Sequence, residues 1–352
     1  MRRLHVLAIT ALVLAVPAPR ATAGDETVAT LDRPAPVSAY AGRLLWSRYD
    51  ATADRYRLVT RFAGQVSDVP VAPRAVPFDA DLGPDAGGAT VAVYSRCRTD
   101  PPDYDGPASA LYGKGKGCDL YRFDFATGRE SAIASASAPD ASEFWPTIWK
   151  GTLAFARTYD AKPDYPYIYT RPVSGRATST RMPGGPRRAC VRDRRTAAVS
   201  CSNDRVSRPT ALELYGRRLG FGWTYAGPGE GLANEIRLDT IGGGHARLAT
   251  AGSGGLTQTE VDWPAFSGGA MFWSMQCFGD PGGCPGRYGL FRYRLATGAT
   301  ARAPGPQSVL AHERDGATTY LLTDRTSAGF CAGDPPVPGG TCDLIGSQPA
   351  FG

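Results

Sequence analysis

Histidine and lysine are scarce in this chain of 352 residues, which has three histidines and only four lysines among 39 basic residues. With so few histidines and no Cys-x-x-Cys spacing, the sequence offers no ligand set for a zinc site. His245 and His312 stand in no motif typical of a catalytic triad, and the glycine-rich phosphate and dinucleotide motifs are absent. The sequence therefore predicts no metal, no cofactor and no catalytic residues, and it favours a protein without enzyme activity while leaving the alternative open.

Long hydrophobic runs are also lacking, except near the N-terminus. A basic start at Arg2 and Arg3 precedes an apolar run over residues 4–16, and Ala21-Thr22-Ala23 has the small-x-small pattern that signal peptidases cleave. The run is too short for a permanent transmembrane helix. We expect a signal peptide at 1–23, a secreted protein without stable membrane insertion, and a single domain at 24–352. An uncleaved anchor is the alternative.

A strong charge of either sign is lacking as well. Loss of the leader removes Arg2, Arg3 and Arg20, so the formal net charge of +6 falls by three to +3. Proteins that bind nucleic acids usually carry a strongly basic field. We therefore expect no nucleic-acid partner, and we expect a monomer.

Cysteine is present in an even number, eight, and the residues form four couples that are close in sequence. The couples are Cys97 with Cys118, Cys190 with Cys201, Cys277 with Cys284, and Cys331 with Cys342. Eight cysteines allow 105 pairings in principle, and sequence alone does not select one. Export to an oxidising compartment and the short separations favour four local disulfides over a zinc site.

Amphipathic helix patterns are nearly absent, whereas short β-branched and aromatic runs between glycine, proline and aspartate turns occur throughout. A unit of about 50 residues with four such runs repeats six times, which is typical of propeller blades. The second run of each unit is apolar: 44–46, 91–94, 153–155, 219–221, 271–273 and 320–322. We expect an all-β, six-bladed β-propeller; a seventh blade is the alternative if the long second unit hides further strands.

The two ends of the repeat complement each other. The sixth unit stops after its third strand, near 342–345, whereas a spare strand at 27–31 precedes the first unit. Pairing of these segments would remove two free sheet edges. We therefore expect the N-terminal strand to close the last blade; a frayed N-terminal tail is the alternative.

Two units share a strand and turn that carry a resemblance. Residues 119–128 read Asp-Leu-Tyr-Arg-Phe-Asp-Phe-Ala-Thr-Gly, and residues 289–298 end on the same Ala-Thr-Gly after an aromatic strand. This pattern resembles the repeats of TolB-like and related WD40-like propellers, and the stretch from Asp81 to Cys97 resembles secreted actinobacterial proteins of unknown role. The resemblance implies the fold, and it implies binding more often than catalysis.

Carboxylates and tryptophans recur just before the predicted innermost strands. They are Asp79 and Asp81, Glu143 and Trp145, and Glu260, Asp262 and Trp263. At the mouth of a central channel they would suit a sugar or a cationic ligand, and a carboxylate pair at the right spacing could hydrolyse a glycosidic bond. The alternative is structural: Trp-Pro would pack between blades, and the carboxylates would cap strand ends.

The cysteine couples and an arginine-rich loop fall on one predicted face. Propeller connectivity puts the loops that hold all four couples on the same face, and the loop with Arg187 and Arg188 carries five arginines. Guanidinium groups suit phosphate or carboxylate polymers; a solvated loop is the alternative. We expect a secreted binding or scaffold propeller that recognises an extracellular protein or a cell-wall glycan. The alternatives are a carbohydrate-active hydrolase or lyase with carboxylates at the channel, and a structural subunit of an envelope assembly.

Overall fold

A computed structural model describes residues 26–347 with the exception of several short stretches. These stretches are 33–34, 102–114, 176–177, 183–189, 193–194, 202–206, 227–231, 255–256, 280–288, 304–309, 313–315, 317 and 325–341. The predicted signal peptide therefore lies outside the described residues. Within them, no helix has the length and apolar character needed to cross a membrane.

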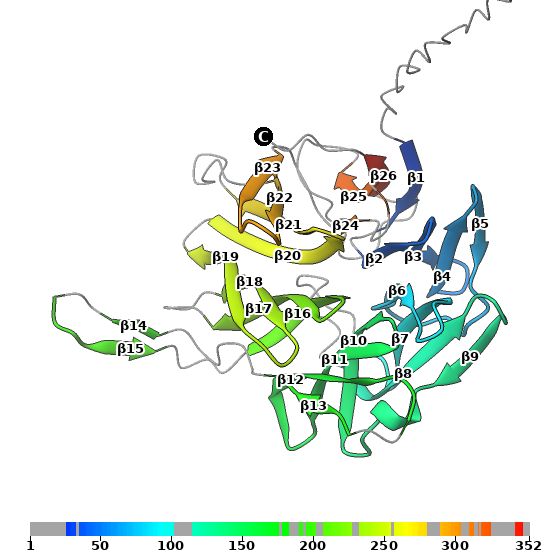
Figure 1. Ribbon diagram of the computed structural model, residues 1–352, viewed down its shortest axis with the longest axis horizontal. Coiled ribbons are helices and arrows are strands. Elements are labelled where there is room, and N and C mark those ends of the chain that lie inside the picture. The colour runs from blue at the N-terminus through cyan, green and yellow to red at the C-terminus, as the bar shows by residue number, and fades with distance from the viewer. Residues whose placement is uncertain are drawn as a thin grey trace, which may run out of the picture.

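In the described part of the chain, twenty-four strands form six antiparallel blades around an axis, which confirms the predicted six-bladed propeller (Figure 1). Blade 1 holds β2 (Val37–Tyr40), β3 (Arg43–Asp50), β4 (Arg55–Phe62) and β5 (Gln65–Asp68). Blade 2 holds β6 (Asp81–Pro84), β7 (Thr90–Thr99), β8 (Lys116–Asp124) and β9 (Arg129–Ala132). Blade 3 holds β10 (Ala141–Trp149), β11 (Thr152–Tyr159), β12 (Lys162–Pro172) and β13 (Thr180–Arg181).

The second half of the ring repeats this order. Blade 4 holds β16 (Ser207–Tyr215), β17 (Arg218–Ala226), β18 (Leu232–Thr240) and β19 (His245–Gly254). Blade 5 holds β20 (Thr257–Ser267), β21 (Ala270–Gly279), β22 (Gly289–Arg294) and β23 (Thr300–Ala303). Blade 6 holds β24 (Leu310–His312), β25 (Thr319–Asp324) and β26 (Cys342–Ser347). A short 3₁₀ turn, η2 (Ala134–Ala136), precedes blade 3.

The predicted closure of the ring is confirmed. Strand β1 (Glu26–Leu31) pairs antiparallel with β26 and becomes the fourth strand of blade 6. The Thr30 hydroxyl donates to Asp343 at 2.8 Å, and Arg61 of blade 1 forms an ion pair with Glu26 at 2.6 Å. The first strand thus joins the last blade and contacts the first one.

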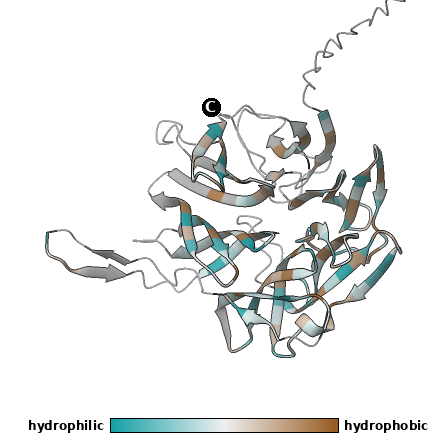
Figure 2. Ribbon diagram, viewed as in Figure 1, coloured by the Kyte–Doolittle hydropathy of each residue, from teal (hydrophilic) through white to brown (hydrophobic). Residues whose placement is uncertain are grey.

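The core fills the gaps between neighbouring blades, because each sheet buries both faces against its neighbours. Residues such as Leu45, Phe78 and Tyr94 fill the gap between blades 1 and 2, whereas Val93 and Phe155 do so between blades 2 and 3. Figure 2 shows hydrophobic (brown) and hydrophilic (teal) residues mixed along the strands of the blades.

Tight turns join the first and second strands of blades 1 and 3. In blade 1, Ala41 and Gly42 both have positive φ (52° and 69°), and in blade 3 Lys150 and Gly151 do as well (45° and 73°). Positive φ at both central residues is the type I′ geometry that matches the twist of the flanking strands. We call the face on which these turns emerge the turn face, and the opposite face the loop face.

Candidate functional site

The Asp79 carboxylate lies at the centre of a buried hydrogen-bond network between blades 2 and 3. It accepts from the Ser95 hydroxyl at 2.7 Å, the Ser95 N–H at 2.9 Å and the Trp145 N–H at 2.8 Å. Arg74 adds an ion pair at 3.3 Å, and both charged side chains are almost fully buried. The arrangement fixes the start of β6 against blade 3.

Asp81 connects three blades. Its carboxylate accepts from the Ser38 hydroxyl of blade 1 at 2.7 Å and from the Ile148 N–H of blade 3 at 3.1 Å. Ser38 in turn accepts from the Leu82 N–H of blade 2 at 2.9 Å. These contacts hold the inner strands of blades 1, 2 and 3 in register and occupy both oxygens of Asp81.

Trp145 and Trp263 lie inside the inner strands β10 and β20, at matching β-bulges. The strand register shifts between Phe144 and Thr147 and again between Asp262 and Ala265. Both tryptophans have positive φ, 51° and 60°. Our prediction that Glu143, Trp145, Glu260, Asp262 and Trp263 precede the innermost strands is therefore wrong. A proline after each tryptophan indicates a strand end in sequence, but here the strand bulges at the proline and continues.

The two indole rings meet near the propeller axis. Their centroids are 5.8 Å apart with an edge-to-face angle of 71°, and both residues are buried. Trp145 is on blade 3 and Trp263 is on blade 5, and blade 4 lies between these two blades. The two rings can therefore meet only on the side of β16, the inner strand of blade 4, that faces the axis. The pair therefore crosses the central channel.

A second aromatic group crosses the channel closer to the turn face. The Trp149 ring contacts Tyr40 of blade 1 at 5.8 Å and Tyr215 of blade 4 at 4.3 Å between centroids. In a ring of six, blades 1 and 4 stand opposite each other. A hollow lined by Ser38, Glu213 and Pro264, among others, has room for about one water molecule. At these two levels, the channel thus holds packed aromatic side chains.

Glu143 also forms a buried ion pair within blade 3. Its carboxylate is fully buried and pairs with Arg157 at 2.7 Å. Arg157 donates to the Ala136 carbonyl and lies 4.8 Å from the centroid of the Tyr169 ring. Burial raises the pKa of the Glu143 carboxyl to about 7, although the Arg157 charge opposes this shift.

The remaining predicted site residues are described only in part. Glu260 and Asp262 lie on β20, where their backbones pair with Gln276 and Ser274. Arg187 and Arg188 lie outside the described residues. The structure thus links Asp79 to Trp145 and Trp145 to Trp263, and ligand binding by the predicted set stays a prediction.

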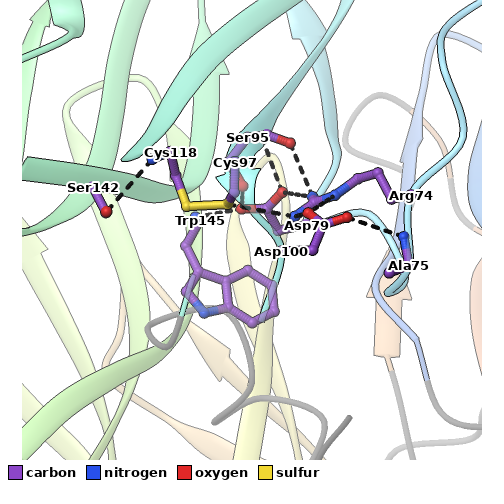
Figure 3. The surroundings of a disulfide bond; sticks show 9 residues. All are labelled: Arg74, Ala75, Asp79, Ser95, Cys97, Asp100, Cys118, Ser142 and Trp145. Atoms are coloured by element: carbon purple, nitrogen blue, oxygen red, sulfur yellow. Dashed lines mark hydrogen bonds and ion pairs between the residues drawn. A yellow bond between two sulfur atoms is a disulfide. The ribbon is translucent and has the colours of Figure 1, made fainter. Parts of the chain in front are cut away.

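One predicted disulfide, Cys97–Cys118, is present (Figure 3). The two residues face each other across β7 and β8, and Arg74 and Asp100 lie beside them (Figure 3). Cys342 is also disulfide-bonded. The predicted partner Cys331, like Cys284, lies outside the described residues, and the side chains of Cys190, Cys201 and Cys277 are not described.

A hairpin outside the six blades carries Cys190 and Cys201, where the sequence predicts a loop between two blades. Strands β14 (Cys190–Arg192) and β15 (Val199–Cys201) pair with each other in a separate sheet, with Cys190 directly opposite Cys201. The hairpin projects away from the propeller body (Figure 1). Arg195, near its tip, is exposed.

Sequence reasoning also missed a contact in blade 4 between an exposed histidine and a buried aspartate. The His245 Nδ1 atom lies 2.9 Å from Asp239 Oδ2, and the Asp239 side chain is buried. Burial raises the pKa of Asp239, while the hydrogen bond from His245 lowers it. The two residues meet because Asp239 on β18 and His245 on β19 are directly opposite each other in the hairpin. The sequence alone does not reveal this strand register.

No family model matches the chain, and no curated protein sequence matches it. Among solved structures, a puromycin hydrolase is 17% identical over 82% of this chain and 43% of its own, with a TM-score of 0.43. A puromycin-hydrolyzing peptidase of Mycobacterium tuberculosis is 12% identical over 87% of this chain and 54% of its own, with a TM-score of 0.42. The chain thus spans about half the length of these proteins.

A fungal lectin from Aleuria aurantia, described as a six-bladed β-propeller with a fucose recognition mode, is also similar in structure. It is 10% identical over 84% of this chain and 90% of its own, with a TM-score of 0.45. At these identities and TM-scores, none of the three assigns a function to this chain. The resemblance to TolB-like repeats stays a prediction.

Proposed function

We propose that the protein is an exported binding or scaffold propeller that recognises an extracellular protein or a cell-wall glycan through its loop face. The observation that supports this most is the β14–β15 hairpin, which pairs with none of the blades and projects from the body (Figure 1). A segment that adds nothing to blade pairing, on a rigid scaffold, is where binding function usually lies.

The chemistry of this hairpin favours an anionic partner. The segment between Pro186 and Cys201 contains five arginines. Planar guanidinium groups bind carboxylates and phosphates in a bidentate manner. A disulfide at the loop face, Cys97–Cys118, supports an oxidising compartment and hence export.

The hydrolase alternative has less support, because three of its candidate carboxylates are engaged in contacts within the fold. Asp79 and Asp81 accept hydrogen bonds from neighbouring blades, and Glu143 pairs with Arg157. A glycosidase needs two carboxyl groups that face the same open substrate site.

Co-sedimentation with purified, insoluble cell walls tests the proposal. The double variant Arg187→Ala/Arg188→Ala should be retained at least about tenfold more weakly than the parent, since hydrogen bonds to charged groups contribute about 1.5–3 kcal/mol each. Arg129→Ala/Arg294→Ala, which removes two exposed arginines from strand ends of blades 2 and 5, is the matched control. If both double variants are retained equally, the arginine-rich segment is not the element that binds the cell wall.

A further inference from the structure

A repeated hydrogen bond joins the inner strands of neighbouring blades. In each case a polar side chain on one inner strand accepts from a backbone N–H on the inner strand of the next blade. The three contacts are Ser38 with the Leu82 N–H at 2.9 Å, Asp81 with the Ile148 N–H at 3.1 Å, and the Thr147 hydroxyl with the Leu214 N–H at 2.9 Å. They link blades 1 to 2, 2 to 3 and 3 to 4.

The strand register shows which residue of blade 6 corresponds to these N–H donors. The donor Leu214 lies opposite Leu219, the second residue of β17, and Ile148 has the same register in blade 3. In blade 6, Ala311 lies opposite Tyr320, the second residue of β25. Ala311 therefore holds the donor position of blade 6, and we expect its N–H to face the inner strand of blade 5.

The corresponding acceptor position in blade 5 is an alanine. The acceptor stands directly before the donor position, as Thr147 stands before Ile148 in blade 3. In blade 5, Phe266 holds the donor position by the same register, so that Ala265 holds the acceptor position. A methyl group accepts no hydrogen bond, whereas buried backbone N–H groups nearly always have a partner. The Ala311 N–H therefore requires an acceptor other than the side chain at 265.

The small hollow in the channel lies at this position. Ala265, Ala311 and Glu213 line it together with residues 37–39 and Pro264, and it has room for about one water molecule. Ala265 and Ala311 are both only 3% exposed. Among the residues that line the hollow, Glu213 carries the charged side chain. The hollow thus brings a carboxylate of blade 4 near the donor position of blade 6.

We propose that this hollow is a binding site for one structural water molecule, which takes the place of a polar side chain at position 265. The water accepts from the Ala311 N–H and donates to the Glu213 carboxylate, and two to four polar partners are what a buried water needs. A metal ion fits less well, because no group of three acidic, histidine or cysteine side chains among the described residues could hold one. The proposal is independent of the loop-face function.

A crystal structure of the mature protein, at a resolution that shows ordered water, tests the site directly. We expect one density peak in the hollow, about 2.7–3.2 Å from both the Ala311 nitrogen and a Glu213 carboxylate oxygen. A hollow without density overturns the proposal. Contacts of about 2.3–2.6 Å to several oxygen atoms would instead identify a cation and overturn the assignment of water.

Serine at position 265 gives a second test in solution. The hydroxyl of Ala265→Ser should replace the water and accept from the Ala311 N–H, as Ser38 accepts from Leu82 in blade 1. This variant should unfold at the same or a higher urea concentration than the parent.

Ala92→Ser is the matched control for this substitution, because Ala92 is fully buried in the apolar cluster between blades 1 and 2. A hydroxyl in apolar surroundings is costly, so this variant should unfold at a lower urea concentration than the parent. A fall as large for Ala265→Ser as for Ala92→Ser would overturn the proposal. The crystal structure of the parent decides the question if Ala265→Ser fails to fold.

Discussion

The backbone N–H of Trp145 lies 2.8 Å from Oδ2 of Asp79, and this hydrogen bond joins the inner strand of blade 3 to the start of blade 2. It holds a tryptophan whose φ of 51° is rare for a bulky residue. The same indole then contacts Trp263 of blade 5. Asp79 therefore stabilises the bulge that places an aromatic ring in the channel.

Replacement of Asp79 by alanine should destabilise the protein by about 3–5 kcal/mol. The change removes the acceptor of the Trp145 N–H and deprives the buried Arg74 of one of its two carboxylate partners. Urea unfolding of the parent and the variant measures the difference. Asp140→Ala, at an exposed carboxylate, is the control; if both variants unfold at the same urea concentration, the network does not stabilise the fold.

The two channel tryptophans should be energetically coupled. Trp145→Ala and Trp263→Ala should each cost about 3–5 kcal/mol, because each leaves a cavity in a packed interior. Their edge-to-face contact should appear as a coupling energy of about 0.5–1.5 kcal/mol in a double-mutant cycle. Strictly additive losses would mean that the rings do not meet in solution.

Much of this fold could be predicted from sequence, because the signal repeats. Six apolar second strands, each after a glycine turn, specify six sheets, and the spare segment at Glu26–Leu31 completes the sixth. The strand pattern of a single unit is weak evidence for a blade, but its repetition in six units makes the prediction of the fold strong. The hairpin at Cys190 and Cys201 has no such repeat, and its sequence alone predicts only a loop between two blades.

The roles of the candidate site residues could not be predicted in the same way. Asp79 and Trp145 are 66 positions apart, and their hydrogen bond exists only because blades 2 and 3 pack side by side. The sequence shows that carboxylates and tryptophans recur in corresponding positions. It does not show whether their polar atoms point toward solvent or toward the next blade.

Glu143 should make stability depend on pH around neutrality. Its folded-state pKa of about 7 lies above the ordinary value near 4.3, so the native state binds this proton more tightly than the unfolded chain does. The contribution is fully present below about pH 4 and is lost as pH rises through about 7. Its size is at most about 4 kcal/mol.

Comparison of the parent with Glu143→Gln isolates this effect. Burial also raises the pKa values of Glu235 and Asp239, and they add a slope of the same sign to both proteins. The free energy of unfolding, measured by urea between pH 5 and 8, should therefore fall less steeply in Glu143→Gln than in the parent. Identical slopes would show that Glu143 titrates in the same way in the folded and unfolded chains.

The disulfide at the loop face should stabilise the protein mainly by restricting the unfolded chain. It closes a loop with a sequence separation of 21 residues, for which the chain-entropy model gives about 3 kcal/mol. Cys97→Ala/Cys118→Ala should lose about this amount in urea unfolding while the six-bladed fold persists, since the β7–β8 pairing continues on both sides of Cys97. A loss below about 1 kcal/mol would mean that strand pairing alone already fixes this loop.

Gly115 offers a matched test of how tightly the chain packs against this disulfide. A Cβ at Gly115 would lie 2.7 Å from the sulfur atoms of both Cys97 and Cys118, so Gly115→Ala should destabilise the oxidised protein by about 1–3 kcal/mol. In the Cys97→Ala/Cys118→Ala background the sulfurs are gone and the added methyl group has room, so the same substitution should cost much less. The difference between the two backgrounds, obtained from urea unfolding curves, is a coupling energy. An equal cost in both backgrounds would place the strain at the Gly115 backbone instead of at the sulfurs.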